Sequence, residues 1–346
     1  MKSFLFVIPS LKNTSPIKVS LSYANNLAIK GHDVSIFVLN KSNINCSLDH
    51  KIKVVGWRSL FDSYDYIHTH CLKPNFLLAF LTFFKLIKST LITTVHTNIK
   101  LDLIDRIPFG SRYISYLWRL SILQHDIIFC LNEENKNIIS LGDPYLNEKI
   151  YVIPNGIDGI KVNDVEDEVF LSFIKKDPNA IILGSACVLR KVKRIDIVLS
   201  LLHKYKNIKF VLIGMGPEYD NLRELSSKYG INDRVLFLGF KDSPNDYMSY
   251  VDIAVFPSLS EGFPLSLVEA MSLGIPCITS DIDAFKYFFN DEIKRFKSIE
   301  DFYLLINSVY QNRSFISNMV TEKYANNFTI NAVIDKYLLI LKNHDI

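Results

Sequence analysis

The chain has 346 residues and a mass of 39.8 kDa, more than one hydrophobic core usually organises, so two domains are expected. Hydrophobic residues make up 49% of the sequence, charged residues make up 22%, and the mean hydropathy is +0.15, as in a soluble globular protein. Five scattered cysteines without a CxxC pair argue against a disulfide framework or a zinc site and favour reduced thiols in the cytosol.

The net charge of +3 is unevenly distributed along the chain. Residues 1–150 contain 17 Lys and Arg against 11 Asp and Glu, whereas the remainder contains 22 against 25. A basic first half could attract an anionic acceptor or an anionic membrane surface. A solvated basic face without a partner explains the charge equally well, so charge alone identifies no partner.

The first half of the chain predicts alternating strands and helices. It begins with MKSFLFVIPSL, which imitates a signal peptide, but Pro9 ends the apolar run early and no small-residue cleavage site follows. We therefore expect a first buried strand there. Apolar runs predict strands at residues 4–8, 33–39, 66–69, 91–96 and 127–131.

The most apolar stretch is FLLAFLTFFKLI at residues 76–87. Its twelve residues, interrupted by Lys85, are well short of the roughly 20 needed to span a bilayer. We expect a buried or interfacial helix, and we favour a place in the core over membrane contact.

The second half repeats the pattern, with strands predicted at residues 180–186, 209–214, 234–239, 253–257 and 277–280. Near-continuous apolar strands separated by helices indicate parallel sheets covered on both faces. Between the two series, VIPNGIDGIKVNDVEDEVF combines turn residues with an acidic segment that reads as a linker. The sequence therefore predicts two doubly wound α/β domains, with ligands at the carboxyl ends of the strands.

A carboxylate pair lies in the stretch PSLSEGFPLSLVEAMSLGIPC, where Glu261 precedes Glu269 by eight positions. Pro264 fits the first position of a helix over about 264–273, and Gly274 fits the position after its end. The amino end of this helix follows a buried strand, where backbone N–H groups and the helix dipole favour a phosphate. Glu269 falls among apolar neighbours and needs donors, which ribose or sugar hydroxyls would supply.

E-x₇-E within SEGFPLSLVEA, followed by GIP, resembles the donor-site signature of retaining family-4 glycosyltransferases of the GT-B fold. Further stretches similar to that family follow one another in the expected order along nearly the whole chain. They are GHDVSIFV, YDYIHTH, TTVHTN, HDIIFCLNEENKNI, VIPNGID, VLIGMGP and DRVLFLGF.

The resemblance implies a GT-B architecture of two Rossmann-like domains that face a central cleft. An acceptor-binding domain would comprise residues 1–158, with a C-terminal helix at about 328–346 crossing back onto it. A nucleotide-sugar-binding domain would comprise residues 159–327.

The resemblance also implies roles for single residues. Glu269 would accept hydrogen bonds from the ribose hydroxyls, and Glu261 would contact hydroxyls of the transferred sugar. The diphosphate would meet the residues Gly262, Phe263, Pro264 and Leu265. The base would lie at Phe240. Gly214 and Gly216 form a GxG pattern that would lie near the ligand. A tight turn without any ligand explains the two glycines as well.

A basic loop, VLRKVKRIDIVL, separates a predicted strand from a helix. By resemblance, Lys193 takes the place of the lysine that neutralises the departing diphosphate. Val188 occupies the position at which the family has an arginine. Arg190 is the nearest basic residue that could take over the role of that arginine. Basic residues on a solvated surface are the alternative, which the adjacent helix start disfavours.

Three histidines lie on predicted strands of the first domain. In the family, a histidine at the position of His96 lies near the transferred sugar; a strand-end histidine with one polar partner is an equally good reading of His96 alone. His68 and His70 share one strand face, and their H-x-H spacing could suggest a metal site. No third ligand has suitable spacing, and the family typically needs no metal, so neither a metal nor another cofactor is expected.

One departure concerns the first loop, PSLKNTSPIKVS, which lacks the family's usual Gly-Gly pair. Either the helix start at Ser15-Pro16 supplies the N–H groups instead, or the acceptor site is remodelled. The missing pair lends some weight to a non-catalytic nucleotide-sugar-binding protein.

The sequence thus predicts a cytoplasmic hexosyl- or N-acetylhexosaminyltransferase, acting at the inner face of the cytoplasmic membrane. It would use a UDP-sugar and a glycan or polyprenyl- or other lipid-linked acceptor in surface polysaccharide or lipopolysaccharide synthesis; nucleic acid is not an expected partner. A nucleotide-sugar epimerase of similar fold is the enzymatic alternative. A dehydrogenase is disfavoured because no G-x-G-x-x-G follows the first strand.

Overall fold

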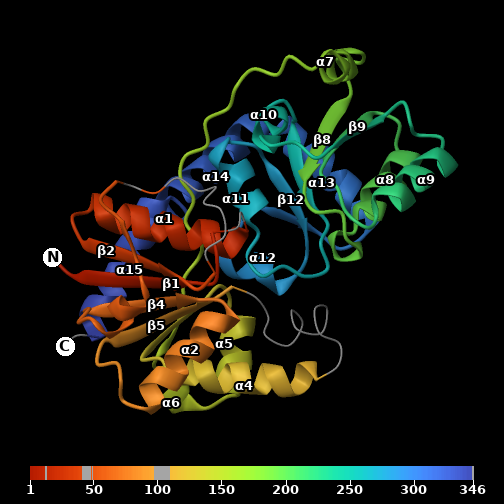
Figure 1. Cartoon of the computed structure of the whole chain (residues 1–346). Coiled ribbons are helices and arrows are strands. Elements are labelled where there is room, and N and C mark those ends of the chain that lie inside the picture. The colour runs from red at the N-terminus through yellow and green to blue at the C-terminus, as the bar shows by residue number, and fades with distance from the viewer. Residues whose placement is uncertain (12–13, 41–47, 49, 97–109, 345–346) are drawn as a thin grey trace. The chain divides into compact units, whose positions relative to one another are not determined.

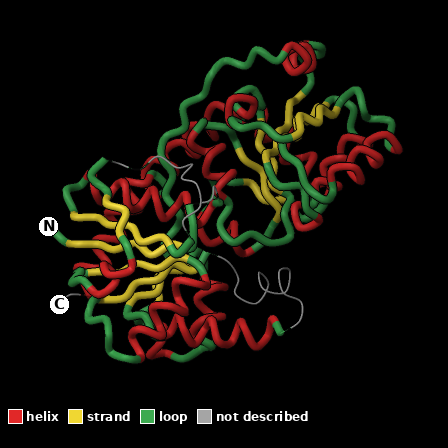
Figure 2. Tube along the Cα trace, in the orientation of Figure 1, coloured by secondary structure: helices red, strands yellow, loops and turns green. Residues whose placement is uncertain are grey.

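The computed structural model describes residues 1–11, 14–40, 48, 50–96 and 110–344, and it divides into two compact units. Unit 1 comprises Met1–Asp158 and Phe328–Ile346, and unit 2 comprises Gly159–Asn327. Figure 2 shows that each unit has a core of strands flanked by helices.

Unit 1 is built on a seven-stranded sheet with the order β3-β2-β1-β4-β5-β6-β7, in which every pair is parallel (Figure 1). The strands are β1 Ser3–Ile8, β2 Asp33–Val38, β3 Lys53–Val55, β4 Tyr66–His70, β5 Thr90–Val95, β6 Ile127–Cys130 and β7 Ile150–Val152. The described helices are α1 Ser15–Ile29, η1 Trp57–Phe61, α2 Leu72–Phe83, α4 Ser111–Leu123, α5 Glu133–Ser140, α6 Pro144–Asn147 and α15 Ile330–His344.

Helices cover both faces of this sheet because successive side chains of a strand point to opposite sides. Phe4 and Phe6 of β1 lie in a core cluster with residues of α1 and α15. Leu5 and Val7 lie in a second cluster, with Leu78 of α2. The strand β1 is consequently buried on both faces, as its unbroken apolar run predicts.

The C-terminal helix α15 belongs to unit 1, and the residues just before it pair with the end of the segment Met1–Asp158. Ile157 and Thr329 form a parallel β-bridge immediately before α15. At Gly156, a Cβ would lie 2.7 Å from the Cα of Ile330, so the close approach requires glycine. Tyr337 of α15 is fully buried in the unit 1 core.

Unit 2 is built on a six-stranded parallel sheet with the order β10-β9-β8-β11-β12-β13. Its strands are β8 Ile181–Ala186, β9 Ile208–Ile213, β10 Val235–Gly239, β11 Ile253–Phe256, β12 Cys277–Ser280 and β13 Lys294–Phe296. Its helices are α7 Glu168–Lys175, η2 Lys191–Lys193, α8 Ile195–Lys204, α9 Tyr219–Lys228, α10 Pro244–Met248, α11 Leu265–Ser272, α12 Asp283–Phe288, α13 Ile299–Gln311 and α14 Arg313–Asn327.

The predicted fold class is confirmed, with two doubly wound parallel sheets and a C-terminal helix on the first. Each of the ten predicted strands is present, with ends displaced by at most one residue. The loop after β1 contains residues 12–13, which lie outside the described part of the chain, and α1 then begins at Ser15 with Pro16 in its first turn.

Two local expectations were wrong. Pro264 is the N-cap of α11 and not its first helical residue, because the helix begins at Leu265. The segment 76–87 is not a core helix along its length: α2 ends at Phe83, and Phe80, Phe83 and Leu86 are exposed. None of the described helices has both the length and the hydropathy that crossing a bilayer requires.

Candidate donor-sugar site

The strand order of unit 2 places a switch point between β8 and β11. After β8 the chain crosses to β9 on one side, and after β11 it crosses to β12 on the other. In doubly wound sheets, ligands bind outside the carboxyl ends of the strands at such a point. The loop after β8 contains Arg190 and Lys193, and the loop after β11 contains Glu261.

An ion pair joins these two loops. The Nζ atom of Lys193 lies 2.6 Å from Oε1 of Glu261, and the side chains are only 23% and 11% exposed. The hydroxyl of Ser258 donates to the same carboxylate oxygen over 2.6 Å. A charge-assisted contact with so little solvent around it holds the carboxylate in one orientation.

Two further hydrogen bonds hold the loop after β11, one from the loop after β8 and one from the end of β12. The N–H of Leu259 donates to the carbonyl of Val192 over 2.8 Å. From the end of β12, the hydroxyl of Ser280 donates to the carbonyl of Ser258. The sequence reasoning missed Ser258 and Ser280; Ser258 stands three residues before Glu261, but a serine in a Gly/Pro loop gives no distinct signal.

The two glycines after β9 allow a further loop to pack against the one after β8. A Cβ on Gly214 would lie 1.9 Å from the carbonyl oxygen of Cys187, and one on Gly216 would lie 2.4 Å from that of Leu189. Both distances are far below any tolerated contact, and Gly214 also has φ +131°. The glycines therefore permit close backbone packing that supports the loop carrying Lys193.

The remaining predicted donor-site residues lie in the loops after these strands or on α11. Phe240 follows β10 and is 72% exposed. Glu269 lies half-buried in α11, between the buried residues Val268 and Ala270. Gly262, Phe263 and Leu265 are half-buried beside the start of α11, and Pro264 is buried.

Arg190 is not part of the ion pair. Arg190 is exposed and forms the N-cap of η2, three residues before the half-buried Lys193. Val188, at the position where the family has arginine, is 56% exposed. Met215 (46%) and Phe240 (72%), beside neighbouring strand ends, are exposed as well. These three apolar side chains follow β8, β9 and β10, and sequence reasoning singled out only Phe240.

The predicted histidine of unit 1 lies at the end of β5 and contacts a second histidine. Nε2 of His96 is 2.8 Å from Nδ1 of His70, which ends the neighbouring strand β4. Burial lowers the pKa of His96 to about 4 and holds the pKa of His70 well below its usual range. Both rings are therefore neutral near pH 7.

His68 takes part in a separate set of hydrogen bonds. Its Nε2 lies 2.8 Å from the Thr94 hydroxyl, and its Nδ1 lies 3.2 Å from the hydroxyl of Tyr337 on α15. The His125 ring lies 3.0 Å from the Thr69 hydroxyl, and burial lowers its pKa to about 4. Sequence reasoning found the H-x-H pair but missed His125 and Tyr337, which come from distant parts of the chain.

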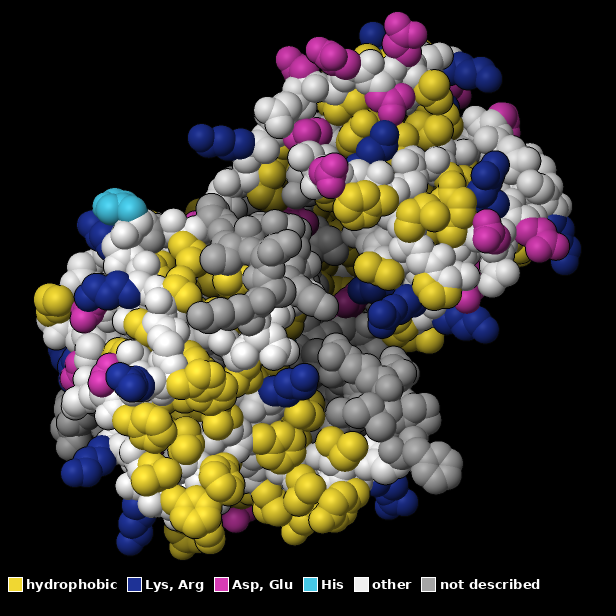
Figure 3. Space-filling model, in the orientation of Figure 1, with side chains coloured by type: hydrophobic (Ala, Val, Ile, Leu, Met, Phe, Trp, Pro, Cys, Tyr) yellow, Lys and Arg dark blue, Asp and Glu magenta, His cyan; other side chains and the backbone are white. Residues whose placement is uncertain are grey.

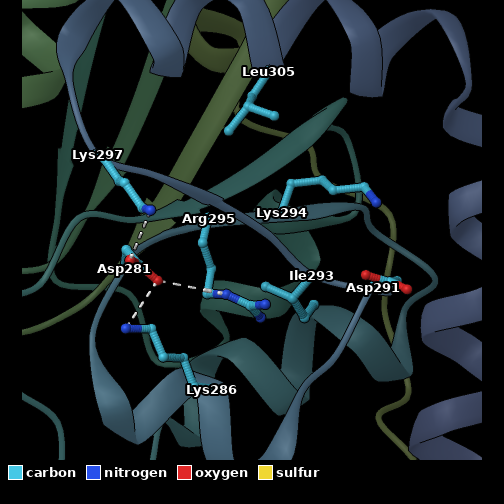
Figure 4. Close-up of a pocket in the computed structure, with 8 residues that line it drawn as sticks. All are labelled: Asp281, Lys286, Asp291, Ile293, Lys294, Arg295, Lys297 and Leu305. Atoms are coloured by element: carbon cyan, nitrogen blue, oxygen red, sulfur yellow. Dashed lines mark ion pairs between the residues drawn. The ribbon is translucent and has the colours of Figure 1, made fainter.

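In the described ranges, no group of three or more His, Cys, Asp and Glu residues is placed to hold a metal ion. A polar pocket in unit 2 lies beside β13, and none of its lining residues is a predicted site residue (Figure 4). Asp281 there forms ion pairs with Lys286 (3.3 Å), Arg295 (3.8 Å) and Lys297 (3.8 Å). The pocket is also lined by Asp291, Ile293, Lys294 and Leu305.

Two family models match the chain. The model described as glycosyl transferases group 1 matches residues 167–328, and that of glycosyltransferase family 4 matches residues 52–159. The O-antigen biosynthesis glycosyltransferase WclY of Escherichia coli is 29% identical over 353 residues, which cover 98% of this chain and 97% of WclY.

Solved structures share the fold over the whole length. Anabaena HepE in complex with UDP superposes with a TM-score of 0.78 at 15% identity, covering 99% of this chain and 100% of HepE. The apo form of the lipopolysaccharide outer core galactosyltransferase WaaB gives 0.73 at 14% identity, covering 99% of each chain. At such identities the likeness establishes the fold, which is GT-B. The chain belongs to glycosyltransferase family 4, the glycosyl transferases group 1.

Proposed function

We propose that this glycosyltransferase moves a hexose or N-acetylhexosamine from a UDP-sugar to a hydroxyl of a glycan or lipid-linked acceptor, with retained anomeric configuration. The observation that carries the proposal is the Lys193–Glu261 ion pair at the switch point of unit 2. A cation and a carboxylate held together there match a ligand that carries both a diphosphate and sugar hydroxyls.

In this mechanism, Lys193 and the start of α11 stabilise the negative charge that grows on the diphosphate as the sugar–phosphate bond breaks. Glu261, oriented by Ser258, accepts hydrogen bonds from hydroxyls of the transferred sugar, and Glu269 accepts those of the ribose. Exposed Phe240, with Met215 and Val188, offers apolar surface to the base. Retention follows if the leaving diphosphate takes the acceptor's proton on the same face.

Relatives support the choice of UDP and of a surface glycan. HepE has been crystallised with UDP and with UDP-glucose, and WclY is described as an O-antigen biosynthesis enzyme. We extend both features to this chain as proposals, including an acceptor made for surface polysaccharide or lipopolysaccharide. We place its action in the cytoplasm, at the inner face of the cytoplasmic membrane.

The test combines nucleotide binding with turnover. A ligand selective for the folded state raises the melting temperature, so UDP should stabilise the protein more than GDP or ADP. Glu261→Ala should keep the shift caused by UDP but reduce release of UDP from UDP-glucose, UDP-galactose or UDP-N-acetylglucosamine by at least about a hundredfold.

Glu224→Ala, which removes an exposed carboxylate of α9, serves as the matched control and should change neither quantity. Turnover that survives Glu261→Ala would overturn the catalytic assignment. Sugar interconversion without any acceptor would favour the epimerase instead, and UDP binding without turnover by the wild-type protein would favour a binding protein.

A further inference from the structure

Unit 1 exposes a group of large apolar side chains on two neighbouring helices. They come from the end of α2, the segment after it and the outer side of α4, and we call them the aromatic surface. Its members are Phe80, Phe83, Phe84, Leu86, Tyr113, Tyr116 and Leu120, which are between 38% and 76% exposed. Figure 3 shows hydrophobic side chains gathered over the region of α2 and α4.

The two helices are packed against the sheet with other residues, so the aromatic surface is not a consequence of missing core contacts. The helix α2 buries Leu78 and Leu81, and α4 buries Trp118 and Ile122. The two helices contact each other, and their partly buried side chains share one core cluster. Each helix therefore has a complete inner face and a second, outer apolar face.

The outer apolar residues follow helical spacing. Tyr113, Tyr116 and Leu120 are separated by three and four positions, which places them on one side of α4. At the end of α2, Phe84 contacts Phe80 with ring centroids 4.8 Å apart and Phe83 with centroids 5.3 Å apart. Contiguous exposed apolar patches on globular proteins mark sites where a protein or a membrane binds.

The charges around the aromatic surface distinguish between a protein and a membrane as its binding partner. Residues 72–88 and 110–123 contain no Asp or Glu. The same two ranges contain the exposed basic residues Lys73, Lys85, Lys88 and Arg112, for which the described residues provide no ion-pair partner. Aromatic rings and leucines bordered by cations that have no ion-pair partner in the described part of the chain match the boundary between acyl chains and anionic headgroups.

We infer that the aromatic surface docks the protein on a bilayer that contains anionic lipids. Phe80, Phe83 and Phe84 enter the headgroup region, the tyrosines lie at its boundary, and the lysines attract the anionic headgroups. The inference deepens the proposed function, since a lipid-linked acceptor is reached from the membrane surface, but vesicle binding tests it without any need for turnover.

The experiment measures co-sedimentation of the full chain with vesicles of phosphatidylethanolamine and phosphatidylglycerol, compared with vesicles of phosphatidylcholine alone. The wild-type protein should prefer the anionic vesicles, and added salt should weaken the binding. Phe83→Ser combined with Tyr116→Ser should reduce binding at least tenfold. Neutralising one lysine near an anionic surface is expected to weaken binding roughly fivefold. Lys85→Glu combined with Lys88→Glu also introduces two negative charges, so this variant should weaken vesicle binding by more than fivefold per residue.

The matched control is Leu304→Ser combined with Phe315→Ser, two side chains of unit 2 that are each 67% exposed. This control should bind vesicles as the wild-type protein does. All variants should keep the melting-temperature shift caused by UDP, which shows that they fold and separates this test from that of the proposed function.

Two results would overturn the inference. One is equal binding of the wild-type protein and the aromatic variant to anionic vesicles, or no binding by either. The other is a wild-type dimer in light scattering that the Phe83→Ser and Tyr116→Ser changes convert to a monomer, which would make the aromatic surface an interface between two copies.

Discussion

His70 and His96 share one hydrogen bond, and only one of the two neutral rings can supply its proton. Nε2 of His70 is buried and has no hydrogen-bond partner among the described residues. A proton on that nitrogen would be a buried donor without an acceptor, which folded proteins rarely contain. The proton of His70 therefore belongs on Nδ1, where it is donated to Nε2 of His96.

This assignment fixes what His96 can do. With Nε2 accepting from His70, the single proton of the neutral His96 ring is on Nδ1. His96 then presents its N–H group at Nδ1 and does not act as a base through Nε2. His70 is accordingly a residue that positions the His96 ring.

We expect long-range proton–nitrogen spectra at pH 7 to show His96 protonated at Nδ1 in the wild-type protein. His70→Phe removes the donor, so His96 should lose this fixed tautomer. His70→Asn keeps an N–H group near the former Nδ1 and should retain it. A wild-type spectrum with His96 protonated at Nε2 would contradict the assignment.

At the scale of the element, the loop after β9 packs against the loop after β8, which carries Lys193 of the proposed donor site. Glycines in the loop after β9 permit this close backbone contact. Gly216→Ala would drive a Cβ to within 2.4 Å of the Leu189 carbonyl oxygen, which belongs to backbone and cannot rotate away. The loop that carries Lys193 should shift, and the protein should lose about 1 to 3 kcal/mol of stability, as for overpacked sites.

Binding and stability can both be measured for this change. Calorimetry should show a lower melting temperature for Gly216→Ala, and the affinity for UDP should fall. Gly159→Ala is the control, because its Cβ would meet nothing within 4 Å. Unchanged UDP affinity in Gly216→Ala would show that the two loops do not depend on each other.

The strands show which elements sequence patterns can predict. Nine of the ten predicted strands contain apolar runs that are buried from both sides; the exception is the edge strand β10, which has an apolar sequence although only Val235 is buried. The ends of all ten differ from the structure by at most one residue. The three strands that were missed are β3, β7 and β13, each three residues long and each at the edge of its sheet. An edge strand pairs on one side only, so residues such as Lys53 and Lys294 are tolerated and the apolar signal disappears.

The candidate site was predictable at the level of loops but not of contacts. A parallel sheet brings the residues after β8 and β11 to one edge, so the positions of Lys193 and Glu261 follow from the strand pattern. Three contacts depend on the directions of side chains, which the periodicity of apolar residues does not determine. They are the Lys193–Glu261 ion pair, the hydrogen bond from Ser258 and the hydrogen bond between His70 and His96.

At the scale of the molecule, the two units differ in their buried titratable groups. Unit 1 contains five buried or half-buried histidines whose pKa values burial lowers: His32 and, with large shifts, His68, His70, His96 and His125. The one histidine within residues 159–327 is the exposed His203. Acid should therefore act on the two units differently.

The sign of the effect follows from the lowered pKa values. Above the ordinary histidine pKa of about 6.5, neither the folded nor the unfolded state binds these protons, and stability is unaffected. As the pH falls below 6.5, the unfolded state binds protons that the folded state refuses until about pH 4 for His96 and His125. Unit 1 should lose about 1.4 kcal/mol per pH unit for each histidine over this window.

The four histidines with large shifts, acting together, would remove about 5 kcal/mol per pH unit near pH 5, comparable to the whole stability of a typical domain. Both tryptophans, Trp57 and Trp118, belong to unit 1, so their fluorescence in urea titrations reports on this unit. We expect its unfolding free energy to fall steeply between pH 6.5 and 4.5, before most carboxylates titrate, while a second calorimetric transition from unit 2 changes little. His125→Gln should reduce the slope by about a quarter. A flat pH profile, or a unit 2 transition that falls first, would mean that the buried histidines do not control the acid stability of the chain.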